Sequence, residues 1–127
     1  MPVITAFYTA LLLLLMLALA INVVRWRLKA KVSFGDGGNR DLNAAIRAHG
    51  NASEHIPLVV IGLALLEMHG ASALAIHGYG ATFVLARVIH PLGLMRPRAV
   101  NRVRQLGVVL TWLVMLGLAA HLLVRII

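Results

Sequence analysis

Arg47, Asn51 and Glu54 are spaced four and three positions apart, immediately before an apolar stretch that runs from Ile56 to Leu66. At about 100° per residue, an α-helix places Asn51 roughly 40° and Glu54 roughly 20° from Arg47, so the three side chains share a single face. Ionisable groups are costly near hydrocarbon and normally face a bundle interior or a wet cavity. The three residues are therefore candidates for binding a charged ligand at a membrane boundary.

Arg87 and His90, three positions apart, form a second polar stripe, and Leu94 lies one turn further along the same face. If the two segments are antiparallel neighbours, both stripes lie at the same depth. One interpretation is a structural ion pair between Arg87 and Glu54. The other is a site for an anionic ligand, because the arginines expected at this depth outnumber the one glutamate. These arginines are Arg25, Arg47, Arg87 and Arg102.

The chain contains six histidines and no cysteine, which excludes thiolate chemistry and disulfides within it. A metal site near Glu54 would use His49, His55 and His90. However, His49 and His55 lie about 120° apart around a helix, unlike the i, i+4 pair that holds one ion. We therefore expect no metal. We also predict no function for a group of residues near the opposite membrane face, namely Glu67, His69, His77 and His121.

The elements that position these residues are predicted to be membrane helices, because 61% of the 127 residues are hydrophobic and the mean hydropathy is +0.89. Four apolar segments cover residues 3–24, 42–66, 71–94 and 106–124. A span needs about 20 residues, or roughly 30 Å of helix. We expect the first segment to be retained, because no Lys or Arg precedes it as in a signal peptide. The sequence predicts an all-α integral membrane four-helix bundle, a single domain over residues 1–127.

Positive charge is concentrated in two of the predicted loops, residues 25–41 and 95–104. Because Lys and Arg favour the cytoplasmic side, we predict that both loops are cytoplasmic and that both termini lie on the opposite side of a bacterial inner membrane. The net charge of +8 is attributed to contact with anionic membrane lipid, not to nucleic acid.

Several residues predict local features of these helices. Asn39 or Asp41 is expected to cap the second helix after the glycine-rich loop 33–39. Pro57 and Pro91 each remove a helical hydrogen bond and favour a kink. Close helix packing is expected at Gly62, Gly78, Gly80 and Gly93.

The string Arg47-Ala48-His49-Gly50-Asn51-Ala52-Ser53-Glu54-His55-Ile56-Pro57 resembles the MAPEG family, the membrane-associated proteins of eicosanoid and glutathione metabolism. This family includes microsomal glutathione transferase, leukotriene C synthase and microsomal prostaglandin E synthase. The resemblance extends over the four segments, the basic first loop and Ala86-Arg87-Val88-Ile89-His90. It implies a homotrimer of four-helix subunits that binds glutathione, as co-substrate, between neighbouring subunits near the cytoplasmic face.

The resemblance also implies roles for individual residues. The positions that hold glutathione in the family correspond here to Arg25, Arg47, Asn51, Glu54 and Arg87, and His90 stands where several members carry a tyrosine. An arginine at the start of the fourth helix is proposed to stabilise the thiolate. Arg102 is the predicted catalytic residue, with Arg98 and Arg104 as alternatives. Leu94 and Gly50 depart from the family pattern, because some members have tyrosine and arginine there.

The implied activity is that of a glutathione transferase or peroxidase that attacks a lipophilic electrophile or hydroperoxide. Two other functions remain open from the residues alone. One is a small transporter or channel subunit in which Glu54 exchanges protons or binds cations, although the arginine surplus disfavours cations. The other is a non-catalytic membrane scaffold.

Overall fold

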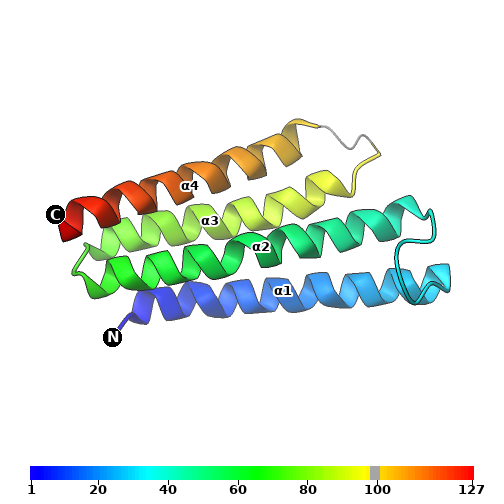
Figure 1. Cartoon of the computed structure of the whole chain (residues 1–127), viewed down its shortest axis with the longest axis horizontal. Coiled ribbons are helices and arrows are strands. Elements are labelled where there is room, and N and C mark those ends of the chain that lie inside the picture. The colour runs from blue at the N-terminus through cyan, green and yellow to red at the C-terminus, as the bar shows by residue number, and fades with distance from the viewer. Residues whose placement is uncertain (98–100) are drawn as a thin grey trace.

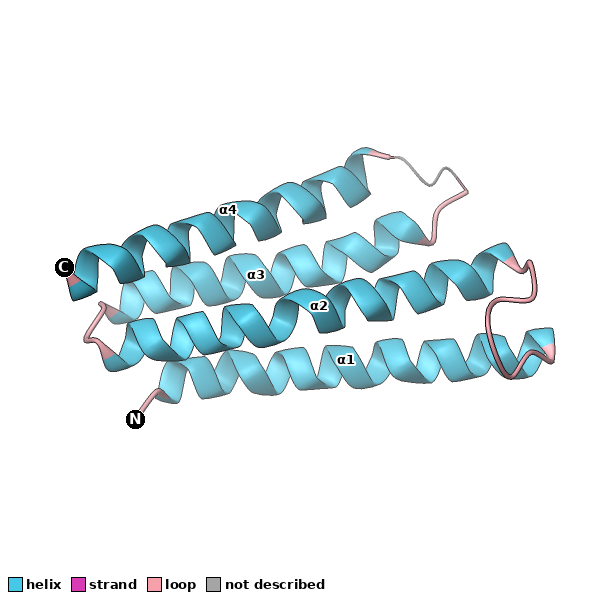
Figure 2. Cartoon of the chain, in the orientation of Figure 1, coloured by secondary structure: helices cyan, strands magenta, loops and turns pink. Residues whose placement is uncertain are grey.

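The computed structural model contains four long helices joined by short connections, and it describes residues 1–97 and 101–127 (Figure 1). The helices are α1 (Val3–Ala30), α2 (Arg40–Met68), α3 (Ala73–Leu94) and α4 (Arg102–Ile126). Within the described residues, everything outside the helices is loop or turn, and none of it is strand (Figure 2). The prediction of an all-α four-helix bundle is confirmed.

Successive helices run in opposite directions along the bundle, so that connected helices are antiparallel (Figure 1). Both chain termini and the α2–α3 connection lie at one end, which we call the terminal end. The end of α1, the start of α2, the end of α3 and the start of α4 lie at the other, which we call the basic end. The two loops rich in Lys and Arg thus share one end of the bundle, as predicted. Which end faces the cytoplasm stays a prediction.

Three of the described helices, α1, α2 and α4, are long and apolar enough to cross a membrane. The remaining helix, α3, has 22 residues and carries Arg87 and two histidines, His77 and His90. Large apolar side chains on the outside of the bundle are strongly exposed, as at Leu13, which is 64% exposed. Such exposure is expected where lipid, not water, surrounds the protein. The chain is therefore an integral membrane protein.

The core is divided into two parts along the bundle. The larger cluster, built around Tyr8, Leu63, Phe83 and Leu118, lies toward the terminal end. The smaller cluster contains Leu19, Ala48 and Ala52. Because two of its three buried members are alanines, the basic half leaves space for buried polar groups. These are Arg87, His90 and Thr111.

Glycines permit the closest helix approaches. A Cβ atom built on Gly80 would lie 2.3 Å from the Tyr8 ring, and one on Gly93 would lie 2.4 Å from the backbone nitrogen of Arg104. Both close contacts were expected. A Cβ on Gly78 would instead meet nothing within 4 Å in the subunit. A further close approach, unforeseen from sequence, places Gly107 against the backbone of His90.

Capping of α2 follows one of the two predicted alternatives. The Asn39 side chain accepts a hydrogen bond from the Leu42 backbone N–H at 2.9 Å, whereas Asp41 pairs with Arg40. Such a cap satisfies an N–H group that the helix itself leaves unpaired. Pro57 and Pro91 lie within α2 and α3, and both helices continue through them.

Glu67 has a structural role that the sequence did not indicate. Its carboxylate, in the last turn of α2, accepts hydrogen bonds from the backbone N–H groups of Ile4 at 2.9 Å and Thr5 at 2.7 Å. The Thr5 hydroxyl donates to the same carboxylate at 2.7 Å. Glu67 therefore caps the N-terminus of α1, where Pro2 provides no side-chain cap.

Candidate functional site

Arg87 lies at the centre of the cluster of buried polar side chains in the basic half, which also includes His90 and Thr111. Its side chain is only 2% exposed. Nη1 donates to Asn51 Oδ1 at 2.7 Å, while Nη2 donates to the Gly107 carbonyl at 3.3 Å and to the Thr111 hydroxyl. Thr111 in turn donates to the Gly107 carbonyl at 2.8 Å. One guanidinium therefore ties α2, α3 and α4 together.

The alternative of an Arg87–Glu54 ion pair is wrong. Among the residues that the structure describes, the ion pair joins Arg40 to Asp41, and Asn51 takes the place beside Arg87 that Glu54 would have filled. The reason is helical geometry, because Asn51 turns toward the bundle interior and is half-buried, whereas Glu54 is exposed. The neutral carboxamide satisfies the buried guanidinium without neutralising it.

Arg47 and Glu54 are exposed on α2, on either side of the half-buried Asn51. In the described part of the chain, neither side chain has a hydrogen-bond or ion-pair partner within the subunit. Arg25 is also exposed, and its guanidinium donates to Asn22 Oδ1 at 2.9 Å. The predicted binding residues thus divide into an outward-facing group and a buried group that meet at Asn51.

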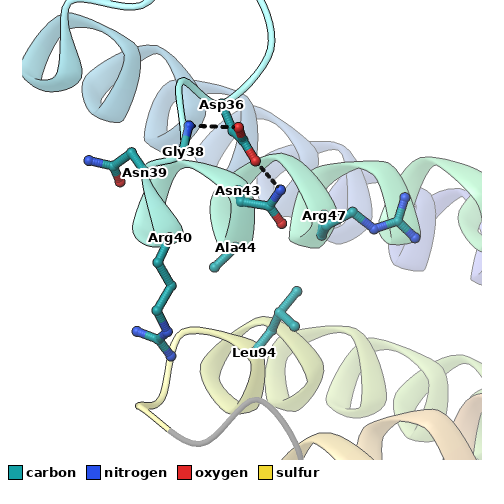
Figure 3. Close-up of a pocket in the computed structure, with 8 residues that line it drawn as sticks. All are labelled: Asp36, Gly38, Asn39, Arg40, Asn43, Ala44, Arg47 and Leu94. Carbon is teal, nitrogen blue, oxygen red and sulfur yellow. Dashed lines mark hydrogen bonds between the residues drawn. The ribbon is translucent and has the colours of Figure 1, made fainter.

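A cleft of about 270 Å³ lies where the first turns of α2 face the end of α3 (Figure 3). Leu94 projects from the α3 side toward Ala44, and Arg47 lies further along α2. On the other side of Ala44, Asp36 accepts a hydrogen bond from the Gly38 N–H and a second from Asn43. These hydrogen bonds lower the pKa of the Asp36 carboxyl below its usual value, and the bond from Gly38 has a larger effect than the bond from Asn43.

Leu94 leaves one wall of this cleft apolar. A tyrosine at that position, which the resemblance described above would lead one to expect, would bring a hydroxyl toward the polar start of α2. Arg40 reaches across from α2 and donates to the Arg96 carbonyl, so it holds the end of α3 in place. Leu94 therefore leaves this wall of the cleft without a polar side chain, while the Arg40 contact still joins the start of α2 to the end of α3.

The two described arginines at the start of α4 differ in position. Arg102 is exposed at the first residue of the helix, whereas Arg104 is half-buried and packs against Gly93 of α3. Arg104 also lines a groove of about 520 Å³ that ends at Trp112. The third alternative, Arg98, lies outside the described residues.

His90 is 3% exposed and packs directly against Gly107. It belongs to the cluster of buried polar side chains and lies one helical turn after Arg87. Within residues 1–97 and 101–127, no three His, Cys, Asp or Glu side chains are grouped to hold a metal ion.

Sequence reasoning missed Thr111 and Gly107. They are spaced i, i+4 on α4 and both face Arg87. The one available signal was a hydroxyl residue within the apolar segment 106–124, and threonines in such segments commonly bond their own backbone. That signal does not identify an arginine partner 24 positions away.

These features define a small, all-helical integral membrane protein, and most of its described charged residues lie toward one end of the bundle. The sequence model of the MAPEG family matches residues 5–124, and the chain belongs to this family. Inner membrane protein YecN of Escherichia coli strain K12 is 35% identical over 113 residues, which are 89% of this chain and 85% of that protein. The same values apply to inner membrane protein YecN of E. coli O6:H1. The predicted family resemblance is confirmed.

Proposed function

We propose that this protein is a glutathione-dependent transferase or peroxidase of a bacterial inner membrane. The observation that carries the proposal is the α2 face, where Arg47 and Glu54 are exposed without a partner in the described part of the subunit and flank Asn51. Unpaired charges beside hydrocarbon are costly. A ligand with both carboxylates and an ammonium group offers a partner to each, and glutathione has this composition.

The site would be completed by a neighbouring subunit of a trimer. Arg47, Glu54 and Arg25 are exposed on one subunit, so a second copy placed against them would enclose the ligand away from lipid. The E. coli relative is named an inner membrane protein, and this name supports an inner-membrane location for this chain as well. We place the basic end on the cytoplasmic side, where glutathione and anionic headgroups would reach it.

The chemical step needs a thiolate. A thiol with a pKa of about 8.5 is only a few per cent ionised at neutral pH, and lowering that value by about two units would ionise most of it. A guanidinium beside the sulfur in a poorly hydrated site provides the stabilisation. With an electrophile, the thiolate forms a C–S bond and displaces a leaving group, or adds to a double bond that then takes up a proton. With a hydroperoxide, the sulfur attacks and breaks the O–O bond, so that an alcohol is released after protonation and a sulfenic acid forms. A second glutathione thiol then condenses with the sulfenic acid to give glutathione disulfide and water.

Position favours Arg104 over Arg102 for this role. Arg104 is half-buried and lines the groove toward Trp112, along which an apolar substrate would lie, whereas Arg102 is exposed at the helix start. A half-buried guanidinium acts on a nearby charge more strongly than a fully solvated one, because water screens it less.

Calorimetric titration of glutathione into the detergent-purified protein tests the proposal. Saturable binding that Arg47→Ala weakens at least tenfold is the expected result. Arg125→Ala is the matched control, because it removes an arginine at the terminal end and should leave binding within twofold. Turnover of glutathione with a lipophilic electrophile and with an organic hydroperoxide would then separate transferase from peroxidase.

Two outcomes would favour other functions. Absence of glutathione binding at millimolar concentration, together with counterflow of a cationic substrate that Glu54→Gln abolishes, would indicate a transporter. Stable trimers that bind no ligand would indicate a scaffold. The relative's name, which states a membrane location and no reaction, supplies the reason to test both.

A further inference from the structure

A groove of about 540 Å³ lies between α3 and α4, toward the terminal end and away from the Arg87 network. Its walls include apolar residues such as Leu113 and Val114. Three polar side chains also line it, namely Tyr79 and Thr82 from α3 and His121 from α4. We call this the terminal groove. Its volume and its mixture of many apolar atoms with a few polar groups are typical of small-molecule sites.

The three polar side chains have no hydrogen-bond partner among the described residues. This contrasts with other polar side chains in the same bundle, because Thr9 donates to the Thr5 carbonyl and Tyr8 pairs with His77. The groove opens on the outside of a membrane bundle, and a hydroxyl or imidazole that faces hydrocarbon without a partner is costly. Three of them in one groove indicate that something supplies hydrogen bonds.

Two glycines shape the groove: Gly78 leaves space in its wall, and Gly117 allows the Tyr79 ring to pack closely against α4. The Tyr79 ring lies over Gly117, where a Cβ atom would come within 2.8 Å of it, and its centroid is 6.1 Å from that of His121. Gly78 forms part of the wall, and a Cβ atom there would meet nothing within 4 Å. Any larger residue at Gly78 would occupy the groove, not the protein core.

From these observations we propose that the terminal groove binds a neutral, lipid-soluble molecule through a carbonyl oxygen. Two hydroxyls and an imidazole N–H offer donors for a carbonyl acceptor. None of the described residues that line the groove is a Lys or Arg, so a carboxylate would lack a counter-charge there. The apolar walls suit an alkyl chain. This inference is independent of the glutathione proposal, because none of its residues lies in that site.

Photolabelling tests the inference. The probe is the methyl ester of a long-chain fatty acid that carries a diazirine close to the ester group, added to the full chain in lipid nanodiscs without glutathione. We expect mass spectrometry to find the label in residues 75–82 and 113–121. Unlabelled ester should compete at least fivefold better than the free acid of the same length.

Two variants make the test specific. Gly78→Leu should reduce labelling at least fivefold, whereas Ala81→Leu, on an exposed face of the same helix outside the groove, should leave it within twofold. If Gly78→Leu fails to fold, the double variant Tyr79→Phe with His121→Leu removes two hydrogen-bonding groups at nearly constant volume and should give the same loss.

Three labelling results and one competition result would overturn the inference. The first is label spread evenly over the lipid-facing helices. The second is equal labelling of Gly78→Leu and Ala81→Leu. The third is an unlabelled native chain, as expected if a second copy covers the groove. Better competition by the free acid than by the ester would refute the assignment of a neutral carbonyl ligand.

Discussion

Arg87 donates a hydrogen bond of 2.7 Å to Oδ1 of Asn51, and this contact fixes which side of the Asn51 carboxamide faces outward. A guanidinium has only donors, so the atom that faces Arg87 must be the carbonyl oxygen. The NH₂ group then points away from Arg87 and has no partner in the described chain. Asn51 therefore offers donors beside Arg47 and Glu54, which suits a carboxylate or carbonyl of a ligand.

Thr111→Val tests whether the α4 hydroxyl supports this arrangement. The variant keeps the shape of the side chain but removes an acceptor from a buried guanidinium whose Nε already lacks a partner among the described residues. We expect the free energy of unfolding in mixed micelles to fall by about 1 to 3 kcal/mol, the usual cost of leaving a buried polar group unsatisfied.

Thr9→Val is the control for this variant, because the Thr9 hydroxyl bonds only to the preceding turn of its own helix. It should change stability by less than about 0.5 kcal/mol. Equal effects of the two variants would show that the Thr111 contact contributes nothing specific. Thr111→Ser, which retains the hydroxyl, should restore most of the lost stability.

Glu54 and Glu67 are predicted to affect different properties, although both lie on α2. Glu67→Ala removes the acceptor of three hydrogen bonds at the N-terminus of α1 and should destabilise the bundle by about 1 to 2 kcal/mol. Glu54→Ala removes an exposed carboxylate and should leave the unfolding midpoint unchanged while weakening glutathione binding.

Chemical denaturation and calorimetry on the same two preparations measure both properties. A loss of stability in Glu54→Ala equal to that in Glu67→Ala would mean that Glu54 has a structural partner in the assembly. A loss of binding in Glu67→Ala, without unfolding, would contradict the assignment of ligand binding to Glu54 and of a purely structural role to Glu67.

Arg104→Ala and Arg102→Ala separate the two described arginines at the start of α4. If the half-buried guanidinium stabilises the thiolate, Arg104→Ala should lower kcat/KM by about 100-fold, the typical loss when one electrostatic donor is removed. Arg102→Ala should lower it by less than about threefold, because solvent screens an exposed charge. The reverse ranking in steady-state kinetics would return the role to Arg102.

Much of the fold was predictable from sequence because membrane helices need long apolar segments and satisfy their own backbone. The four helices, the shared end of the two basic loops and the position of the α2 cap, at Asn39 or Asp41, follow from such local signals. The face that unites Arg47, Asn51 and Glu54 was predictable for the same reason, since it depends only on helical periodicity.

The partners of these residues were less predictable, because they depend on how the helices rotate against one another. Sequence placed Arg87 at the correct depth but could not distinguish Glu54 from Asn51 as its neighbour. Glu67 was assigned no function because its partners are backbone N–H groups more than 60 positions away. Side-chain patterns do not encode such contacts.

The contact between Gly93 and Arg104 provides the final test, because it joins α3 to the arginine assigned to the thiolate. A Cβ atom on Gly93 would lie 2.4 Å from the Arg104 backbone nitrogen, and backbone cannot move aside as a flexible side chain can. Gly93→Ala should therefore push the start of α4 away from α3. We expect a loss of about 1 to 3 kcal/mol in stability. We also expect a fall in kcat/KM, because Arg104 would be displaced.

Gly78→Ala is the matched control, since its Cβ would meet no atom within 4 Å, and it should be neutral or slightly stabilising. If both variants behave alike in denaturation and kinetics, the close approach of α3 and α4 does not position Arg104.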